Sequence, residues 1–222
     1  MQFDLHTHSR HSPDSLASPA ALVLEGRKKG LTGIAVTDHD TIRGGLEARD
    51  ANRDPDFWVI VGAEIKTDAG DVIGLFLERE IRSRRALEVI QEIHEQGGVA
   101  VLPHPFRSRP PREDVVGAVD LLEVFNARLR PEQNRQARDL AERLERPTVC
   151  GSDAHFASDV GACRVVLPGS DVRAALARAV LNTAYTPPFK TSASQIIKAW
   201  RSGRYGRIPY HSARLLKRIL LG

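Results

Sequence analysis

The segment Gly33-Ile-Ala-Val-Thr-Asp-His-Asp40 combines the two features that determine the predicted fold. Its first half is a short apolar run, which is typical of a buried strand, and its second half places a histidine between two carboxylates where that strand would end. Similar segments, in which metal-binding side chains end or directly follow an apolar run, recur along the chain. The recurrence predicts that several strand ends share one site.

Strand-like apolar runs alternate with segments of helical periodicity through the first three quarters of the chain. The predicted strands are residues 3–5, 33–36, 58–61, 72–77, 98–102, 121–125, 148–150 and 164–167. Helices are predicted over residues 18–30, 81–95 and 130–146. Alternation of this kind indicates an α/β fold with a parallel sheet, and a barrel of about seven or eight strands gathers the strand ends more readily than an open sheet. The turn Thr67-Asp-Ala-Gly-Asp71 is a hairpin signal, so we expect the barrel to be distorted.

Length and composition set the class of protein. The 222 residues allow one sizeable core, so we expect one barrel domain at residues 1–185 and a helical extension at residues 186–222. Hydrophobic residues make up 41% and charged residues 27%, which argues against disorder of the whole chain. We find neither a signal-peptide pattern nor about 18 uninterrupted apolar residues, and therefore expect a cytoplasmic protein without membrane association. Cys150 and Cys163 lack CxxC spacing and are expected to be reduced and buried.

The extension at residues 186–222 is basic. From Lys190 onward it contains eight Lys or Arg and no Asp or Glu, whereas the whole chain has a net charge of only +4. One interpretation is contact with nucleic acid or an anionic membrane face, and Trp200, Tyr205 and Tyr210 among the cations suit nucleic acid. The other, favoured on general grounds, is an amphipathic helix packed on the barrel through its Leu and Ile residues.

The pair His6-Thr-His8 is the first candidate for metal binding. Side chains alternate along a strand, so both imidazoles would point to one face and could hold one ion. A single histidine on a strand is, however, more often a structural hydrogen-bonding residue. Asp14 follows in a loop marked by Ser12-Pro13. A carboxylate beside two imidazoles is hard to explain by packing, although it could also cap a turn.

Four further candidates lie at other predicted strand ends. Glu64 follows an apolar run and would be nearly buried, so a cation or a strong donor must face it. His104 ends another run, and Asp153 and His155 end the last one, two residues apart. For each residue by itself, a structural role is about as good an explanation as metal binding. Their joint occurrence at strand ends predicts a polynuclear metal site.

The carboxylate of Asp38 precedes His39 at the end of the quoted segment. A carboxylate that accepts the second ring N–H of a metal-bound histidine fixes its tautomer, and we expect Asp38 to act in this way on His39 or on a neighbouring histidine. The other interpretation of this region is that Asp40-Thr41 caps the following helix.

Taken together, these motifs resemble the PHP family, named for polymerase and histidinol phosphatase. The resemblance rests on Asp4-Leu-His-Thr-His8, Ser12-Pro-Asp14, Gly33-Ile-Ala-Val-Thr-Asp-His-Asp40, Gly62-Ala-Glu-Ile65, His104-Pro105, Glu123-Val-Phe-Asn126 and Gly151-Ser-Asp-Ala-His155. It runs in order from Met1 to about Leu167 and is highly specific. It implies a distorted (β/α)7 TIM-like barrel whose carboxyl strand ends hold two or three Zn, Mn or Fe ions and hydrolyse phosphate esters.

The resemblance also implies which residues bind which ion. His6, His8, Glu64 and Asp153 look like the ligands of one ion, and Asp14, His39 and His155 look like those of another. Glu64 would also bridge to a third ion held by His104. Several family members supply a further histidine to the third ion, but this chain has none between His104 and His155. Glu123 or Asn126 would replace it, or the third site is weak, so we expect two firmly bound ions and a labile third.

The function implied by the resemblance is hydrolysis of a small phosphorylated metabolite or nucleotide by a metal-activated water. Nucleotides that carry separate 3′ and 5′ phosphates are the favoured substrates. Arg107, Arg109 and Arg128 fall on loops at the same mouth and could bind phosphate oxygens, as could Arg43, although ordinary surface charge explains them equally well. The alternative function is exonuclease-like processing or binding of nucleic acid through the basic extension. The sequence does not predict an oligomeric state.

Overall fold

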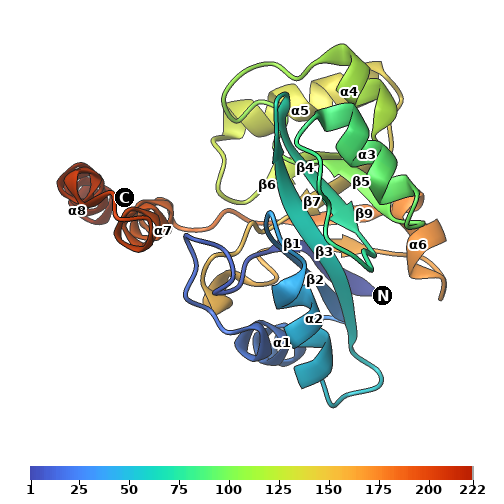
Figure 1. The fold of residues 1–222 in the computed structure, drawn as a ribbon, viewed down its shortest axis with the longest axis horizontal. Coiled ribbons are helices and arrows are strands. Elements are labelled where there is room, and N and C mark those ends of the chain that lie inside the picture. The colour runs from blue at the N-terminus through green and yellow to red at the C-terminus, as the bar shows by residue number, and fades with distance from the viewer. Residues whose placement is uncertain (222) are drawn as a thin grey trace.

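A curved sheet forms the centre of the molecule in the computed structural model, which describes residues 1–221 (Figure 1). Within this range the sheet has nine strands in the order β7-β6-β5-β4-β3-β2-β1-β8-β9. Their bounds are β1 Gln2–Thr7, β2 Gly33–His39, β3 Trp58–Thr67, β4 Gly70–Leu75, β5 Val99–Leu102, β6 Leu121–Asn126, β7 Thr148–Gly151, β8 Cys163–Val166 and β9 Val180–Thr183. The apolar runs of the sequence account for most of these strands.

Strands β1 and β7 meet at their carboxyl ends, which makes the sheet a nearly closed barrel. Thr7, the last residue of β1, pairs in parallel with Ala154, just beyond β7. Two backbone bonds hold this junction, since His8 N–H donates to Ala154 O at 2.8 Å and Ala154 N–H donates to His6 O at 3.2 Å. The expected distorted barrel of seven strands is therefore confirmed. Strand β8 pairs with β1 in antiparallel orientation, and β9 pairs with β8 in the same way.

The distortion lies at the hairpin of β3 and β4. Strand β4 runs antiparallel to both of its neighbours, β3 and β5, and Gly70 at the turn has a φ of 115°. Only glycine adopts that backbone conformation without strain, so the predicted hairpin turn is explained. Because no helix separates β3 from β4, the alternation of strands and helices is interrupted at this point.

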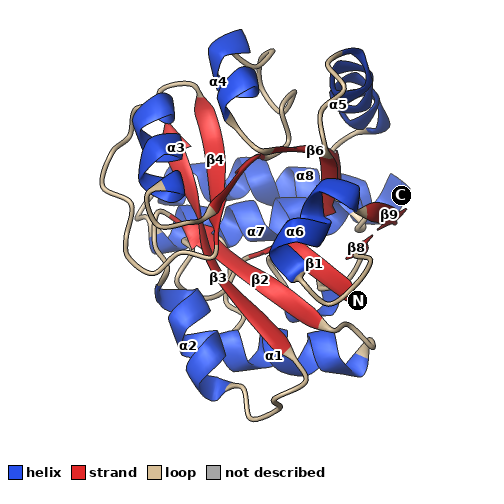
Figure 2. Ribbon diagram, turned by 90° about the vertical axis from the view of Figure 1, so that its right-hand side faces the viewer, coloured by secondary structure: helices blue, strands red, loops and turns tan. Residues whose placement is uncertain are grey.

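Helices surround the barrel, with α1 and α2 on one side of the strands and α3, α4 and α5 on another (Figure 2). Their bounds are α1 Pro19–Lys28, α2 Arg43–Ala51, α3 Ala86–His94, α4 Glu113–Ala118, α5 Pro131–Arg143, α6 Val172–Ala175, α7 Pro188–Arg201 and α8 Ile208–Leu221. The predicted limits of α1 and α5 are confirmed to within a few residues. The Ser18 side chain caps α1 by accepting from Ala21 N–H, and Gly30 follows its end with a φ of 72°.

The helices differ from the sequence prediction at several points, and the short helices α4 and α6 were not predicted. Helix α3 begins at Ala86 and not at Ile81, because the Glu92 side chain binds the backbone N–H groups of Arg82 and Ser83 and holds the preceding segment outside the helix. Helix α2 is the helix expected after Asp40-Thr41, but the sequence did not define its bounds, since two adjacent glycines lower helix propensity. Packing explains these glycines. A Cβ at Gly44 would collide with the side chain of Asp38, and one at Gly45 would lie 3.0 Å from Val61 Cα.

Strand β3 shows how the fold places a carboxylate inside the barrel. Val61, Ala63 and Ile65 pack on the surrounding helices in one buried cluster, whereas Ile60 packs with residues of other strands. Side chains alternate along a strand, so Glu64 shares the face of Ile60. The carboxylate thus lies inside the barrel, close to the carboxyl ends of the parallel strands.

The residues after Thr186 form helices α7 and α8, which lie beside the mouth of the barrel (Figure 1). The boundary proposed at residues 185 and 186 stays a prediction. Among the residues that the structure describes, no helix combines the length and the apolarity needed to cross a bilayer. Cys150 and Cys163 are both free and buried, as expected.

Candidate metal centre

All eight residues predicted as ligands lie together at the carboxyl ends of the barrel strands. His6 lies in β1, His8 and Asp14 in the loop after it, His39 and Glu64 in β2 and β3, His104 in the loop after β5, and Asp153 and His155 in the loop after β7. Seven of the eight are buried, and His39 is partly exposed at 21%. Because these carboxylates and imidazoles have so little contact with water, they must be paired with other groups or with ions inside the protein.

Glu64 occupies the centre of this cluster and is fully buried. Its Oε1 lies 2.8 Å from His104 Nε2, and its Oε2 lies 3.0 Å from His39 Nδ1. The same Oε2 is 3.4 Å from His8 Nε2 and 3.5 Å from His6 Nε2. One carboxylate therefore faces four imidazoles, which is the arrangement expected of a bridging ligand.

Hydrogen bonds orient the rings of His6 and His8 so that their Nε2 atoms face each other. His6 Nδ1 donates to Glu123 Oε1 at 2.9 Å. His8 Nδ1 lies 3.1 Å from Ser12 Oγ. The Ser12 hydroxyl donates its hydrogen to Asp38 Oδ1 at 2.6 Å, so its oxygen accepts a hydrogen bond from the His8 ring. In the neutral form that binds metal, with both Nδ1 atoms carrying hydrogen, the two rings present Nε2 lone pairs only 3.1 Å apart. A cation shared by the two nitrogens resolves this repulsion.

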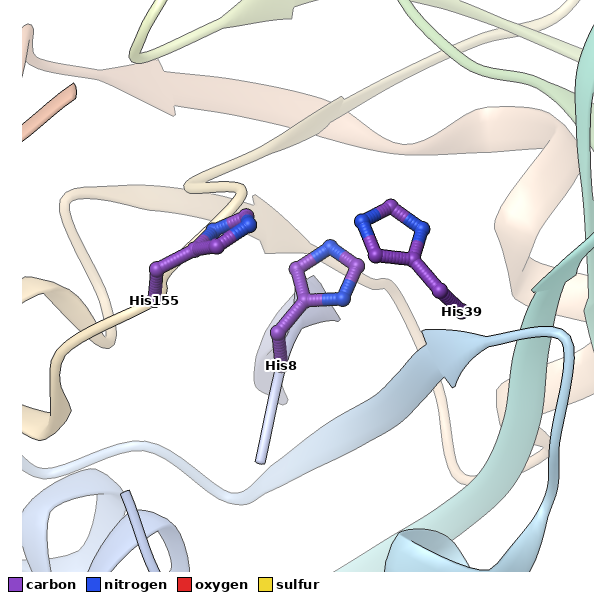
Figure 3. Close-up of side chains that lie close together, drawn as sticks. All are labelled: His8, His39 and His155. Atoms are coloured by element: carbon purple, nitrogen blue, oxygen red, sulfur yellow. The ribbon is translucent and has the colours of Figure 1, made fainter. Parts of the chain in front are cut away.

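A second group of rings lies beside the first. His8 lies between His39 and His155, with ring centroids 4.6 and 4.3 Å away (Figure 3). Asp14 Oδ1 is 3.4 Å from His39 Nε2 and 3.3 Å from His155 Nε2. Asp14 Oδ1 and Glu64 Oε2 are buried and accept no hydrogen bond from the described residues. Carboxylate oxygens left in this state indicate a place for a cation.

The donor set fits divalent metal ions. One ligand atom each from His6, His8 and Glu64 lie within 4.8 Å of one another, and so do single atoms from His8, His39 and His155. Imidazole nitrogen and carboxylate oxygen are the ligands that Zn, Mn and Fe accept in proteins. These residues would hold divalent ions. His8 belongs to both groups, whereas the family resemblance placed it with the first ion alone. The assignment of each residue as a ligand stays a prediction.

Charges within the cluster shift the pKa values of its members. Burial opposes ionisation of Glu64, but the neighbouring His39 and His6 outweigh it and lower its pKa well below the usual range. Burial likewise opposes protonation of His39, yet the negative charges of the nearby Glu64 and Asp14 raise its pKa to about 10. Without bound metal, His39 is therefore a cation at neutral pH, and an ion that binds there must displace its proton.

We predict that metal binding at pH 7 releases about one proton that His39 supplies, and that apparent affinity rises about tenfold per pH unit for each proton displaced. The sign follows from the raised pKa of His39, because the ring keeps its proton up to about pH 10. Calorimetric titration of the metal-free protein in two buffers with different ionisation enthalpies measures the release. His39→Ala should release fewer protons and His94→Gln, on the outer surface, the wild-type number. Equal release in all three proteins would refute the assignment.

Asp38 is linked to the ligand cluster indirectly, through serine side chains. Its buried carboxylate accepts from Ser9 N–H at 2.7 Å, from Ser9 Oγ at 2.6 Å and from Ser12 Oγ at 2.6 Å. The expected bond from a histidine ring to Asp38 is thus replaced by one through Ser12, which accepts from His8. Asp38 orients that ring and the loop that leads to Asp14, and it does not touch the reacting centre.

Arg107 and Arg128 lie at the mouth of the barrel, as predicted, and both contact Asp153. Arg107 Nη2 donates to Asp153 Oδ2 at 2.8 Å, and its Nη1 lies 3.0 Å from His104 Nε2. Arg128 is 5% exposed; its Nη1 contacts Asp153 and the ring of His155, and its Nη2 donates to Ser194 Oγ at 2.6 Å. The other two candidates lie further out. Arg43 begins α2 and is exposed, and Arg109 Nη2 donates to Asp68 O at 2.8 Å.

The residues proposed to complete a third ion site have other partners. Glu123 Oε1 binds His6, and its Oε2 accepts from His104 N–H at 2.9 Å and from Asn126 Nδ2 at 3.0 Å. Asp71, which was not predicted, offers an oxygen within 4.8 Å of ligand atoms of Glu64 and His104. Burial, together with the charge of Glu64, raises the pKa of Asp71.

The register of the hairpin could have identified Asp71 from the sequence. Ile73 pairs with Glu64 across β3 and β4, and Asp71, two residues earlier, shares the face of Ile73. No motif marks Asp71, however, and the register is fixed only once Gly70 is known to form the turn.

A cavity of about 570 Å³ opens above the cluster, and we call it the mouth cavity. Asp14, His39 and His155 form its floor, Arg107 and Arg128 line it, and Thr191, Gln195 and Lys198 of α7 form a wall. Its size lies in the range of sites for small ligands. The mouth cavity therefore offers a cationic chamber directly over the predicted ions.

Comparisons with known proteins agree with this geometry. Residues 4–102 match the family model described as PHP domain, and residues 131–185 match the model described as PHP-associated. An uncharacterized protein of Methanocaldococcus jannaschii is 38% identical over 141 residues, which cover 57% of this chain and 82% of that protein. A 5′-3′ exoribonuclease of Haemophilus influenzae is 30% identical over 113 residues, covering 43% of this chain and 41% of that enzyme.

A solved structure shares the fold. It is a two-domain protein of Bacteroides vulgatus containing a predicted PHP-like metal-dependent phosphoesterase, and it superposes with a TM-score of 0.70 at 20% identity. The match covers 83% of this chain but only 65% of that protein. At this identity the likeness establishes the barrel fold. The residues matched by the PHP domain model, 4–102, contain the first five predicted ligands, from His6 to Glu64.

Proposed function

This chain belongs to the PHP family, and from that membership we propose that it is a metal-dependent phosphoesterase with a dinuclear centre. The observation that carries the proposal is the pair of buried carboxylate oxygens, Asp14 Oδ1 and Glu64 Oε2, that face imidazole nitrogens without accepting a hydrogen bond from the described residues. Divalent ions held there would activate water and neutralise charge on a phosphoryl group. The position of this centre beneath a cationic cavity supports phosphate as the group acted on.

The chain's own residues would orient the substrate. Arg107 is 35% exposed and lines the mouth cavity, so its guanidinium can donate to a phosphoryl oxygen while it stays near Asp153. Arg128 is nearly buried and bonded to Ser194, which restricts it to holding the loop of Asp153 and His155. Asp38 and Glu123 keep the Nε2 atoms of His8 and His6 directed at the centre through the bonds described above.

We propose a small phosphorylated metabolite or nucleotide as substrate, such as a nucleotide with separate 3′ and 5′ phosphates. Two features support this choice. The mouth cavity has room for a ligand of that size, and Lys66, Lys198 and Arg204 add cations along its rim that suit a second anionic group.

A panel of phosphomonoesters and phosphodiesters, assayed with added Mn after purification without chelator, tests the proposed activity. We expect phosphate release that depends on the metal and is fastest for a substrate with two separate phosphates. A protein that carries its ions but hydrolyses no member of the panel would contradict a phosphoesterase function.

Processing of nucleic acid is the second candidate function, and the basic extension at residues 186–222 supports it. Trp200, Tyr205 and Tyr210 are each about 60% exposed among basic residues, an arrangement suited to stacking on unpaired bases. One relative is a 5′-3′ exoribonuclease. Binding of single-stranded RNA whose affinity falls by several log units per log unit of salt would favour this function. Hydrolysis of mononucleotides without such binding would exclude it.

A further inference from the structure

Helix α7 contacts the loops that carry the predicted ligands, although it lies outside the residues matched by the family models. Arg201 Nη1 donates to Ser12 O at 2.7 Å and to Ser15 O at 2.9 Å, on either side of Asp14. Ser194 Oγ accepts from Arg128, which contacts the ring of His155. Ser194 and Ala199 are buried in this contact. The basic extension is therefore held against the mouth of the barrel by specific polar bonds.

Lys198 makes the contact that matters most for the centre. Its Nζ donates to Asp14 Oδ2 at 3.0 Å. The other oxygen of the same carboxylate, Oδ1, faces His39 Nε2 and His155 Nε2 and accepts no hydrogen bond from the described residues. The two oxygens thus have separate roles, one held from outside by an ammonium and one directed inward.

We propose that Lys198 is a positioning residue that orients Asp14 for metal binding, so that docking of α7 sets the affinity of the ion shared by Asp14, His39 and His155. The inference rests on the proposed dinuclear function. Partners of this kind, which hold a ligand by its free side, restrict it to the geometry that the ion needs. Without Lys198 the Asp14 carboxylate, which sits in a loop, would be free to rotate about its side-chain bonds.

Repulsion between the Lys198 ammonium and the bound metal ion would weaken metal binding, whereas the orientation of Asp14 by Lys198 would strengthen it. Lys198 is 41% exposed, so water screens that repulsion, whereas Asp14 is 3% exposed and its orientation depends on protein contacts. Orientation should therefore outweigh repulsion, and loss of Lys198 should weaken binding. The sign of the change separates the two effects.

The test is the affinity of the full-length protein for its second Mn ion, measured by competition with a chromogenic chelator and without substrate. Lys198→Met is expected to weaken this affinity about 10- to 100-fold, while Lys198→Arg, which can donate to the same oxygen, should keep most of it. Lys217→Met on α8 removes the same charge from an exposed position of the tail and should leave the affinity unchanged. Lys198→Gln repeats the test should the methionine variant not fold.

Three outcomes would overturn the inference. Wild-type or tighter affinity in Lys198→Met would show that the ammonium does not orient Asp14. Equal weakening in Lys198→Met and Lys217→Met would assign the effect to the general charge of the tail. Fewer than one ion bound to the wild type would remove the proposed centre itself, whereas two ions in the wild type with no change in Lys198→Met would refute only the role of Lys198.

Discussion

Glu64→Gln is expected to lower the rate of phosphate release by at least about 10³-fold, which corresponds to about 4 kcal/mol of transition-state stabilisation. The reason is the central position of the carboxylate, whose two oxygens face four histidine rings within 3.5 Å. Glutamine keeps the size of the side chain but removes its charge and turns one oxygen into a donor. Metal content and turnover should therefore be lost together.

Glu47→Gln is the matched control for this variant. Glu47 pairs with Arg10 and His11 on the surface and is 38% exposed. Its substitution makes the same chemical change outside the centre and should leave both readouts at wild-type values. Wild-type metal content in Glu64→Gln would refute its role as a bridging ligand, even if turnover fell.

Arg107→Ala is expected to raise KM about 10- to 100-fold and to lower kcat by a smaller factor. A hydrogen bond to a charged group contributes about 1.5–3 kcal/mol, which corresponds to this change in affinity. Arg107 lines the mouth cavity and remains partly exposed, so its guanidinium can reach a substrate phosphate. Steady-state kinetics on the best substrate of the panel measure both constants.

The smaller effect on kcat follows from the contact of Arg107 with Asp153, which the variant also loses. Arg109→Ala serves as the control because Arg109, two residues along the same loop, donates to the carbonyl of Asp68. It should change neither constant. A fall in kcat without a rise in KM for Arg107→Ala would mean that Arg107 supports the centre and does not bind substrate.

The sequence predicted the barrel because each strand is a compact apolar run and each ligand group ends one. It also predicted the hairpin of β3 and β4 from its turn residues. The bounds of α2 and the start of α3 escaped prediction for local reasons. Gly44 and Gly45 suit a close approach to Asp38 and Val61 but disfavour a helix, and Glu92 binds the backbone ahead of α3 across several residues.

The site was predictable where ligands lie in short motifs and not where a partner comes from a distant element. His6 and Glu64 lie near the ends of β1 and β3, Asp153 comes just after β7, and the fold brings them together as expected. The partners of these residues follow no spacing rule. Glu123 was expected at a third ion but holds His6, and Lys198 reaches Asp14 across 184 residues of sequence. Such contacts depend on tertiary packing, which periodicity and motif spacing do not encode.

The most direct test of the dinuclear centre is the number of metal ions per chain, determined by inductively coupled plasma mass spectrometry on protein purified without chelator. The buried carboxylate oxygens of Asp14 and Glu64, facing histidine nitrogens without a hydrogen bond from the described residues, predict two ions of Zn, Mn or Fe per chain. Fewer than one ion per chain, with none taken up on addition of Mn, would contradict the account.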